Sequence, residues 1–284
     1  MVRREFVDVG TDRKLSALVW GTAEPELVFL HGGSQNAHTW DTVAMALRPT
    51  SLVAIDLPGH GHSDGPSEHQ LSGGGPLAAA EDVATVIRAL APNARGVIGM
   101  SYGGLITIAL TDVSRDLVRK VVLVDVLPGL DPEHARHISD FVNGPATFPD
   151  FEDLLARTIQ FNPTRSVSSL RRGILHNAVQ LDDGSWAWRH SRWRIDSPSD
   201  ATAPPTPTGS PMFADLLDTL SRIEVPLLLA RGMRADSVLR DDDEAELLRR
   251  LPKAHVVHFD RAGHSIQGDM PVELAAAIEA FISG

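Results

Sequence analysis

The chain has 284 residues and contains no cysteine, which excludes disulfides, cysteine nucleophiles and thiolate metal sites. Its formal net charge of −11 makes nucleic-acid binding unexpected, because binding to phosphates needs a concentrated basic surface. Its hydrophobic and charged fractions, 43% and 22%, are ordinary for a globular protein that folds without disulfides or metal. No apolar segment resembles a signal peptide or is long enough to span a bilayer. We therefore expect no membrane contact and a cytoplasmic location.

Short runs that are apolar on both faces recur along the chain, and segments with helical spacing separate most of them. The runs cover residues 27–30, 52–55, 97–98, 121–124, 227–229 and 256–257. Such runs are typical of central strands in a parallel sheet that is covered by helices on both faces. The alternation predicts a doubly wound α/β fold, in which ligands bind beyond the carboxyl ends of the strands.

The alternation fails between about residue 130 and residue 221. We predict one α/β core formed by residues 1–129 and 222–284, with residues 130–221 inserted as a cap, or lid. The inserted stretch contains Trp186, Trp188 and Trp193, which could line an apolar substrate wall or form the small core that a cap needs. Its Pro/Ser/Thr-rich part, residues 197–211, is either a stiff return connection or a disordered loop.

The strongest chemical motif is a G-x-S-x-G sequence, Gly99 to Gly103, with Ser101 at its centre. It follows the apolar run 97–98 and precedes a segment that can open a helix. A sharp turn from strand to helix forces strained backbone angles at the serine, and small residues on either side relieve the crowding. This context predicts a nucleophile elbow, with Ser101 as the nucleophile.

A serine nucleophile needs a base, and the base needs an acid that orients it. His264 is the best candidate for the base, because it lies between the last apolar run and the final helix. For the acid we choose Asp236, which follows the run 227–229 and stands before His264 in the order typical of this kind of triad. Asp125, at the end of the run 121–124, is the rival.

Acyl transfer also needs hydrogen-bond donors for the developing oxyanion. The backbone N–H of Tyr102, directly after the nucleophile, is one candidate. The loop after the run 27–30 should supply the second, with Gly33 favoured because glycine permits close approach of the backbone. Trp40, further along this loop, either lines the substrate pocket or packs in the interior.

The sequence Asp56-Leu57-Pro58-Gly59-His60-Gly61-His62-Ser63, together with the motifs around Gly33, Ser101, Asp236 and His264, resembles α/β-hydrolases of the small esterase and C–C hydrolase type. The resemblance implies an eight-stranded, mostly parallel sheet, a helical cap after the sixth strand and no cofactor. It also implies the roles assigned above to the nucleophile, acid, base and two oxyanion amides. His60 and His62 have metal-like spacing, but in this family the loop is a structural turn, so no metal site is expected.

The leading hypothesis for function is hydrolysis of a carboxylic ester or lactone through an acyl-enzyme, with a small, apolar substrate. An alternative is C–C bond hydrolysis of an acidic diketone-type compound, which requires a cation for the substrate carboxylate. Arg189, Arg192 and Arg194 of the cap are candidates for that cation. A hypothesis of another class is a non-catalytic small-molecule receptor built on a hydrolase scaffold. The sequence carries no signal for the oligomeric state.

Overall fold

A sheet of eight strands forms the centre of the computed structural model, which describes residues 1–10, 12–163, 165–191 and 211–284. The strands are β1 (Val2–Asp8), β2 (Lys14–Trp20), β3 (Leu27–Leu30), β4 (Leu52–Ile55), β5 (Gly96–Met100), β6 (Val121–Val124), β10 (Leu227–Gly232) and β11 (His255–Phe259). Their order in the sheet is β1-β2-β4-β3-β5-β6-β10-β11. Strand β2 is antiparallel to both β1 and β4, and the other neighbours are parallel. The predicted α/β fold, with its mostly parallel sheet, is confirmed.

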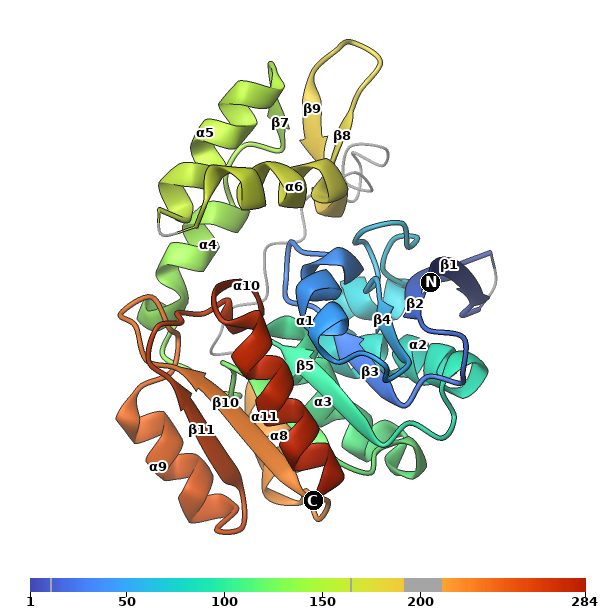
Figure 1. Cartoon of the computed structure of the whole chain (residues 1–284), viewed down its shortest axis with the longest axis vertical. Coiled ribbons are helices and arrows are strands. Elements are labelled where there is room, and N and C mark those ends of the chain that lie inside the picture. The colour runs from blue at the N-terminus through green and yellow to red at the C-terminus, as the bar shows by residue number, and fades with distance from the viewer. Residues whose placement is uncertain (11, 164, 192–210) are drawn as a thin grey trace.

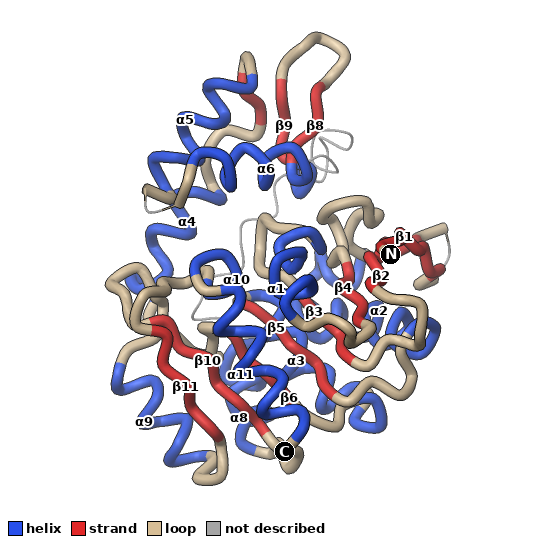
Figure 2. Tube along the Cα trace, viewed as in Figure 1, coloured by secondary structure: helices blue, strands red, loops and turns tan. Residues whose placement is uncertain are grey.

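Helices cover both faces of this sheet, as Figures 1 and 2 show. They are η1 (Ala37–Trp40), α1 (Asp41–Ala46), η2 (Gln70–Gly74), α2 (Gly75–Leu90), α3 (Tyr102–Val113), η3 (Arg115–Leu117), α8 (Pro211–Ser221), α9 (Asp241–Arg250), α10 (Ile266–Asp269) and α11 (Pro271–Ser283). Buried side chains of α2, α3, α8 and α9 join one hydrophobic cluster, and those of α1, α10 and α11 join a second. None of the helices in the described ranges is both long and apolar enough to cross a membrane.

Residues 131–191, here called the cap, follow β6 and lie above the core in Figure 1. The cap contains η4 (Pro132–Ala135), α4 (Arg136–Val142), α5 (Phe151–Phe161), α6 (Val167–Asn177) and η5 (Arg189–Ser191). Its strands β7 (Thr147–Phe148), β8 (Ala178–Gln180) and β9 (Trp186–Trp188) form a three-stranded antiparallel sheet. The predicted helical cap thus also contains a sheet. Trp188 is buried in a hydrophobic cluster of the cap, and Trp186 packs against that cluster.

Helix α8 lies inside the predicted insertion 130–221 but packs with the core. It contacts α3, and its residues Leu216 and Leu220 are buried in the cluster on that face of the sheet. The predicted boundary after residue 221 assigns this helix to the insertion, whereas its buried apolar side chains pack in the core cluster. Trp193 and most of the Pro-rich segment 197–211 lie outside the described residues.

Candidate active site

Ser101 forms the sharp turn between β5 and α3. Its backbone has φ 50° and ψ −120°, in the left-handed half of backbone space that non-glycine residues rarely adopt. A Cβ atom on Gly103 would lie 2.4 Å from the carbonyl oxygen of Leu30, and one on Gly99 would lie 2.4 Å from that of Gly103. Side chains at these two positions would therefore collide with the backbone, which is the predicted reason for small residues around the elbow.

His264 lies in the loop between β11 and α10, and its ring contacts the carboxylate of Asp125. The distance from His264 Nδ1 to Asp125 Oδ2 is 2.9 Å. Asp125 directly follows β6 and is fully buried. Its other donors are the N–H of Gly232 at 3.0 Å, Ser237 Oγ at 2.7 Å and the N–H of Val238 at 3.1 Å. These donors satisfy a buried carboxylate that would otherwise be costly to remove from water.

Asp236, the acid chosen from the sequence, does not contact His264 in this way. Its carboxylate lies 3.0 Å from Arg234 Nη2, and 43% of its side chain is exposed. Strands β6 and β10 are parallel neighbours, so the loop after β10 covers the end of β6 and directs its N–H groups at Asp125. The assignment of Asp236 as the orienting acid is therefore wrong, and the rival Asp125 occupies that place.

Gly33 and Tyr102, the two predicted oxyanion donors, line the same cavity as Ser101. Within the described residues, neither backbone N–H donates a hydrogen bond to another protein group. Both are therefore available to a ligand. Tyr102 N–H lies at the first position of α3, where helix N–H groups have no intrahelical acceptor.

Two histidines hold the loop that carries Gly33. Nε2 of His31 accepts the N–H of Leu57 at 3.0 Å, and its Nδ1 lies 2.8 Å from the carbonyl of the adjoining glycine. Nε2 of His60 accepts the N–H of Ser34 at 3.1 Å. A ring nitrogen that accepts must be unprotonated, so both imidazoles are neutral here. Burial lowers the pKa of His31 to about 3.

Neither His60 nor His62 lies in a group of metal-ligating side chains among the described residues. The described group that could offer three ligand atoms is His38, Asp41 and His176, at the contact between core and cap. The rings of His38 and His176 stack with centroids 3.9 Å apart, and Asp41 forms an ion pair with Arg172. The arrangement therefore already joins core and cap through protein contacts.

Trp40 does not line the substrate pocket. It is fully buried in the core cluster with α1 and α11, and its ring centroid lies 4.9 Å from that of Phe29. The prediction of a substrate-binding role is therefore wrong, and the alternative of interior packing holds. No sequence signal separates these outcomes, because a tryptophan in a loop next to the site suits both.

Ser101 and His264 line one cavity of about 220 Å³ between the core and the cap. Apolar cap side chains, including Ile138, Phe141 and Phe161, form part of its wall. Within the described residues no hydrogen bond joins Ser101 to His264. Catalytic hydrogen bonds in ligand-free enzymes are often long and tighten when substrate binds. Sequence analysis did not identify the cap residues of this wall.

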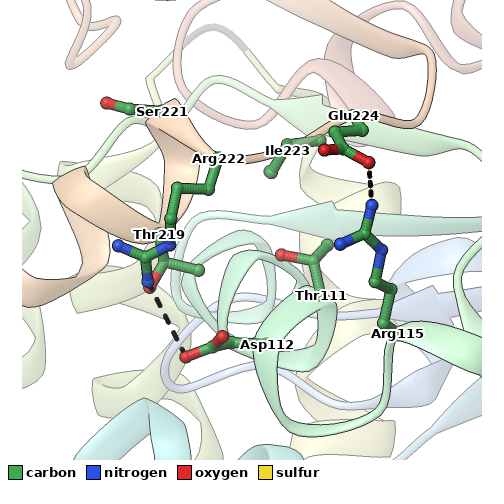
Figure 3. Close-up of a pocket in the computed structure, with 8 residues that line it drawn as sticks. All are labelled: Thr111, Asp112, Arg115, Thr219, Ser221, Arg222, Ile223 and Glu224. Carbon is green, nitrogen blue, oxygen red and sulfur yellow. Dashed lines mark hydrogen bonds and ion pairs between the residues drawn. The ribbon is translucent and has the colours of Figure 1, made fainter.

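A larger cavity, of about 340 Å³, shares no lining residue with the cavity of Ser101 and His264. Figure 3 shows its lining residues from α3, η3 and the end of α8. Arg115 pairs with Glu224, and Arg222 lies 3.9 Å from Asp112. Its charged side chains are thus paired with one another, and none of the proposed catalytic residues is present.

Comparisons with known proteins agree with this fold. A family model described as the alpha/beta hydrolase family matches residues 27–277. The esterase Rv0045c of Mycobacterium tuberculosis is 40% identical over 279 residues, which cover 94% of this chain and 86% of the relative. A 3-hydroxybutyrate-oligomer hydrolase of Cupriavidus necator is 29% identical over 270 residues, 92% of this chain and 90% of the relative.

Solved structures give the same result. A crystal structure of the M. tuberculosis esterase matches with a TM-score of 0.79 and 38% identity, covering 100% of this chain and 92% of that one. The structure of E-2-(acetamidomethylene)succinate hydrolase matches with a TM-score of 0.80 at 24% identity, covering 100% of both chains. The second likeness concerns the fold alone, whereas the first is also a clear likeness in sequence.

Proposed function

This chain belongs to the α/β-hydrolase family, and we propose that it cleaves carboxylic esters or lactones through an acyl-enzyme formed on Ser101. His264 is the base and Asp125 is the carboxylate that orients it. The observation that carries the proposal is the 2.9 Å contact between His264 Nδ1 and Asp125 Oδ2, beside the cavity that also exposes Ser101.

The contact with Asp125 determines which nitrogen of His264 acts. When Nδ1–H donates to the carboxylate, Nε2 carries the lone pair that can accept the proton of Ser101. The serine oxygen then bonds to the substrate carbonyl carbon, and the carbonyl oxygen becomes an oxyanion. The N–H groups of Gly33 and Tyr102 stabilise that charge.

Collapse of the tetrahedral intermediate breaks the ester C–O bond. His264 returns its proton to the leaving alcohol, and the acyl group stays on Ser101. Water then attacks the acyl carbon and gives one proton to His264. The bond between the acyl carbon and Ser101 Oγ breaks, His264 returns the proton to Ser101 Oγ, and the carboxylic acid is released. The imidazolium formed in each half-reaction is stabilised by the buried carboxylate of Asp125.

Labelling with a fluorophosphonate tests this proposal, because the reagent modifies a serine only where a base activates it. We expect modification of Ser101, located by mass spectrometry of the peptides, with parallel loss of p-nitrophenyl acetate turnover. Ser101→Ala should remove both labelling and turnover. Ser72→Ala, at an exposed serine that donates to the His69 carbonyl, should retain both.

A chain that takes no label and turns over no ester would contradict the proposal. That outcome would favour the non-catalytic receptor instead. Labelling of another serine, with Ser101 unmodified, would show that the nucleophile is assigned wrongly even if esters are cleaved.

A further inference from the structure

A second cavity, of about 190 Å³, adjoins the catalytic cavity and is here called the second chamber. Both cavities share wall residues Ser34, Gln35, Phe141, Asn162 and Arg165. The second chamber lies between the loop after β3 and helix α6 of the cap. Most of its lining side chains are polar, in contrast to the apolar cap wall beside Ser101. A substrate that extends past these shared residues would therefore enter polar surroundings.

Arg165 reaches this boundary from the cap, just before α6. Its guanidinium group contacts the core at Gly268 of α10, where a Cβ atom would lie 3.0 Å from Arg165 Cζ. Among the described residues, its side chain donates one hydrogen bond, from Nη2 to Ser169 Oγ at 3.1 Å. Nε is buried and has no acceptor among the described residues. The cation thus faces both cavities with only a hydroxyl as its partner.

The acids near Arg165 are paired with other groups. Asp269 accepts the N–H of Gly263 at 3.0 Å and lies 3.6 Å from Arg234. Asp236 lies 3.0 Å from the same Arg234. No carboxylate of the described chain lies within 4.0 Å of the Arg165 guanidinium. A partly buried cation without a directly paired carboxylate is costly. Burial accordingly lowers the pKa of Arg165, and the charge of Asp269 opposes this shift without direct contact.

Gln267 provides a second unpaired group in the chamber wall. It is 2% exposed, and its Oε1 accepts no hydrogen bond within the part of the chain that the structure describes. Its Nε2 lies 3.4 Å from both Gln35 Oε1 and Thr39 Oγ1. Buried polar atoms in native proteins almost always have partners. Arg165 Nε and Gln267 Oε1, which both lack one among the described residues, indicate a chamber built to receive a polar ligand.

The other charged side chain in the chamber wall is less available. Arg172 pairs with Asp41, so its charge is already balanced. His38 and His176 stack on each other, and His38 Nδ1 lies 3.2 Å from the Asp41 carboxylate. Arg165 is therefore the guanidinium in this wall that lacks an anionic partner.

We propose that Arg165 binds a carboxylate of the substrate, so that the preferred substrates are esters that carry a free carboxylate in the second chamber. This inference rests on the proposed ester hydrolysis and names its substrate class. The planar guanidinium suits a carboxylate because its N–H groups match the two oxygens. A site that is built to pair with a group discriminates strongly against analogues that lack it.

Matched pairs of esters test the proposal. In each pair, one ester ends in a carboxylate and the other ends in an isopropyl group of the same shape. For the acyl side, the monomethyl esters of succinate, glutarate and adipate are compared with methyl 4-methylpentanoate, 5-methylhexanoate and 6-methylheptanoate. For the alcohol side, 4-acetoxybutanoate is compared with 4-methylpentyl acetate. Acid release is followed by pH-stat titration. We expect a kcat/KM at least about 10-fold higher for the carboxylate member of one pair.

Variants assign that preference to Arg165. Arg165→Met should lower this preference, the ratio of the two kcat/KM values within a pair, by about 10- to 100-fold, mainly by raising KM for the carboxylate ester. Arg165→Lys keeps the charge without the planar fork and should be intermediate. Arg171→Met is the matched control, because Arg171 lies on α6, directly after the segment that carries Arg165, but pairs with Glu152. A preference that is absent from every pair, or that survives Arg165→Met, overturns the inference.

Binding to Ser101→Ala separates this inference from the proposed function. Calorimetric titration of that variant with the carboxylate esters measures the anion site without turnover. Binding that disappears in Ser101→Ala/Arg165→Met supports the inference whatever the reaction is. Hydrolysis of neutral esters without binding of any carboxylate ester overturns the inference and leaves the proposed function intact.

Discussion

Backbone strain is concentrated in the proposed catalytic site. Four non-glycine residues of the described chain have positive φ, and three of them lie at the site, at Ser34 (61°), Ser101 (50°) and Asp125 (48°). Such conformations cost free energy and persist only where surrounding contacts fix them. Here the N–H of Ser34 bonds to His60, and the Asp125 carboxylate accepts N–H groups from the end of β10 and the loop after it. Ser101 is fixed by the tight turn between β5 and α3.

The charge on Asp125 should control the rate. In Asp125→Asn the side chain can no longer stabilise the imidazolium or hold His264 in its tautomer, and we expect kcat to fall by roughly 10⁴-fold, as in other triads. Asp236→Asn is the matched variant. Its side chain pairs with Arg234, so kcat should change by only a few-fold. Steady-state kinetics on one ester substrate measures both.

Thermal unfolding of the same variants serves as the control, because Asp125 also accepts backbone N–H groups. Both variants must be folded at the assay temperature for their rates to be compared. A large loss in Asp236→Asn with little loss in Asp125→Asn would reverse the assignment.

At the scale of elements, the loop from residue 31 to residue 40 depends on buried polar anchors. His31, within the loop, accepts the N–H of Leu57, and His60 accepts the N–H of Ser34 in the loop. Asp56 accepts the N–H of Ala37 at 2.7 Å. Asp56 also accepts a hydrogen bond from Arg4 Nη1 at 2.8 Å. The loop that presents Gly33 is thus tied to the ends of neighbouring strands before any ligand binds.

Acid should weaken these anchors through His31. The pKa of its buried ring is lowered from 6.5 to about 3, so below pH 6.5 the unfolded chain binds a proton that the folded chain does not. Stability therefore falls as the pH drops from 6.5 toward 3. Between pH 7 and pH 5 this histidine alone should cost roughly 2 kcal/mol. Urea unfolding at the two pH values measures the loss.

Two variants isolate the contribution of His31. The free energy of unfolding of His31→Gln should fall less between pH 7 and pH 5 than that of the wild type. The difference should be about the contribution of one buried histidine. His255→Gln, at an exposed position of β11, should keep the wild-type loss. Equal stability of the wild-type protein at both pH values would refute the neutral, buried state of His31.

Most of the strands that apolar runs predicted are buried, and β11, predicted from the run 256–257, is an exception in which only Phe259 is buried. Strands β3, β4, β5 and β6 are buried along their whole length and appear as purely apolar runs. Strand β1 was missed because it is an edge strand whose side chains are mostly exposed or half-buried. Strand β2 was also missed, although six of its seven residues are buried. Its polar Ser16 and the short spacing to β1 obscure the apolar run.

The choice of acid shows where chain order stops being informative. Both Asp125 and Asp236 follow a strand and stand between Ser101 and His264 in the sequence. What separates them is that β6 and β10 are neighbours, so the loop after one strand encloses the residue after the other. This relation depends on the order of strands in the sheet, which the apolar runs do not specify.

At the scale of the whole molecule, the end of α6 docks the cap on the loop that carries Gly33. Asn177 Nδ2 donates to the carbonyl of Ser34 at 2.6 Å. Asn36 Nδ2 donates to the carbonyl of His176 at 3.0 Å and to Asn177 Oδ1 at 3.1 Å. The ion pair between Arg172 and Asp41 lies in the same contact. The position of the cap and the conformation of the loop that carries Gly33 are therefore linked through one short segment at the end of α6.

Removing Asn177 should loosen this connection without disturbing either hydrophobic core. Asn177→Ala loses the hydrogen bonds to Ser34 and Asn36, each worth about 1 kcal/mol, so the docked cap becomes less populated. We expect kcat/KM to fall by about 10-fold and limited proteolysis within residues 131–191 to accelerate. Gln180→Ala is the control, because among the described residues the Gln180 side chain bonds within its own hairpin, to the Gly184 carbonyl. Unchanged kinetics and proteolysis in Asn177→Ala would mean that other contacts, such as the Arg172 ion pair, suffice to hold the cap in place.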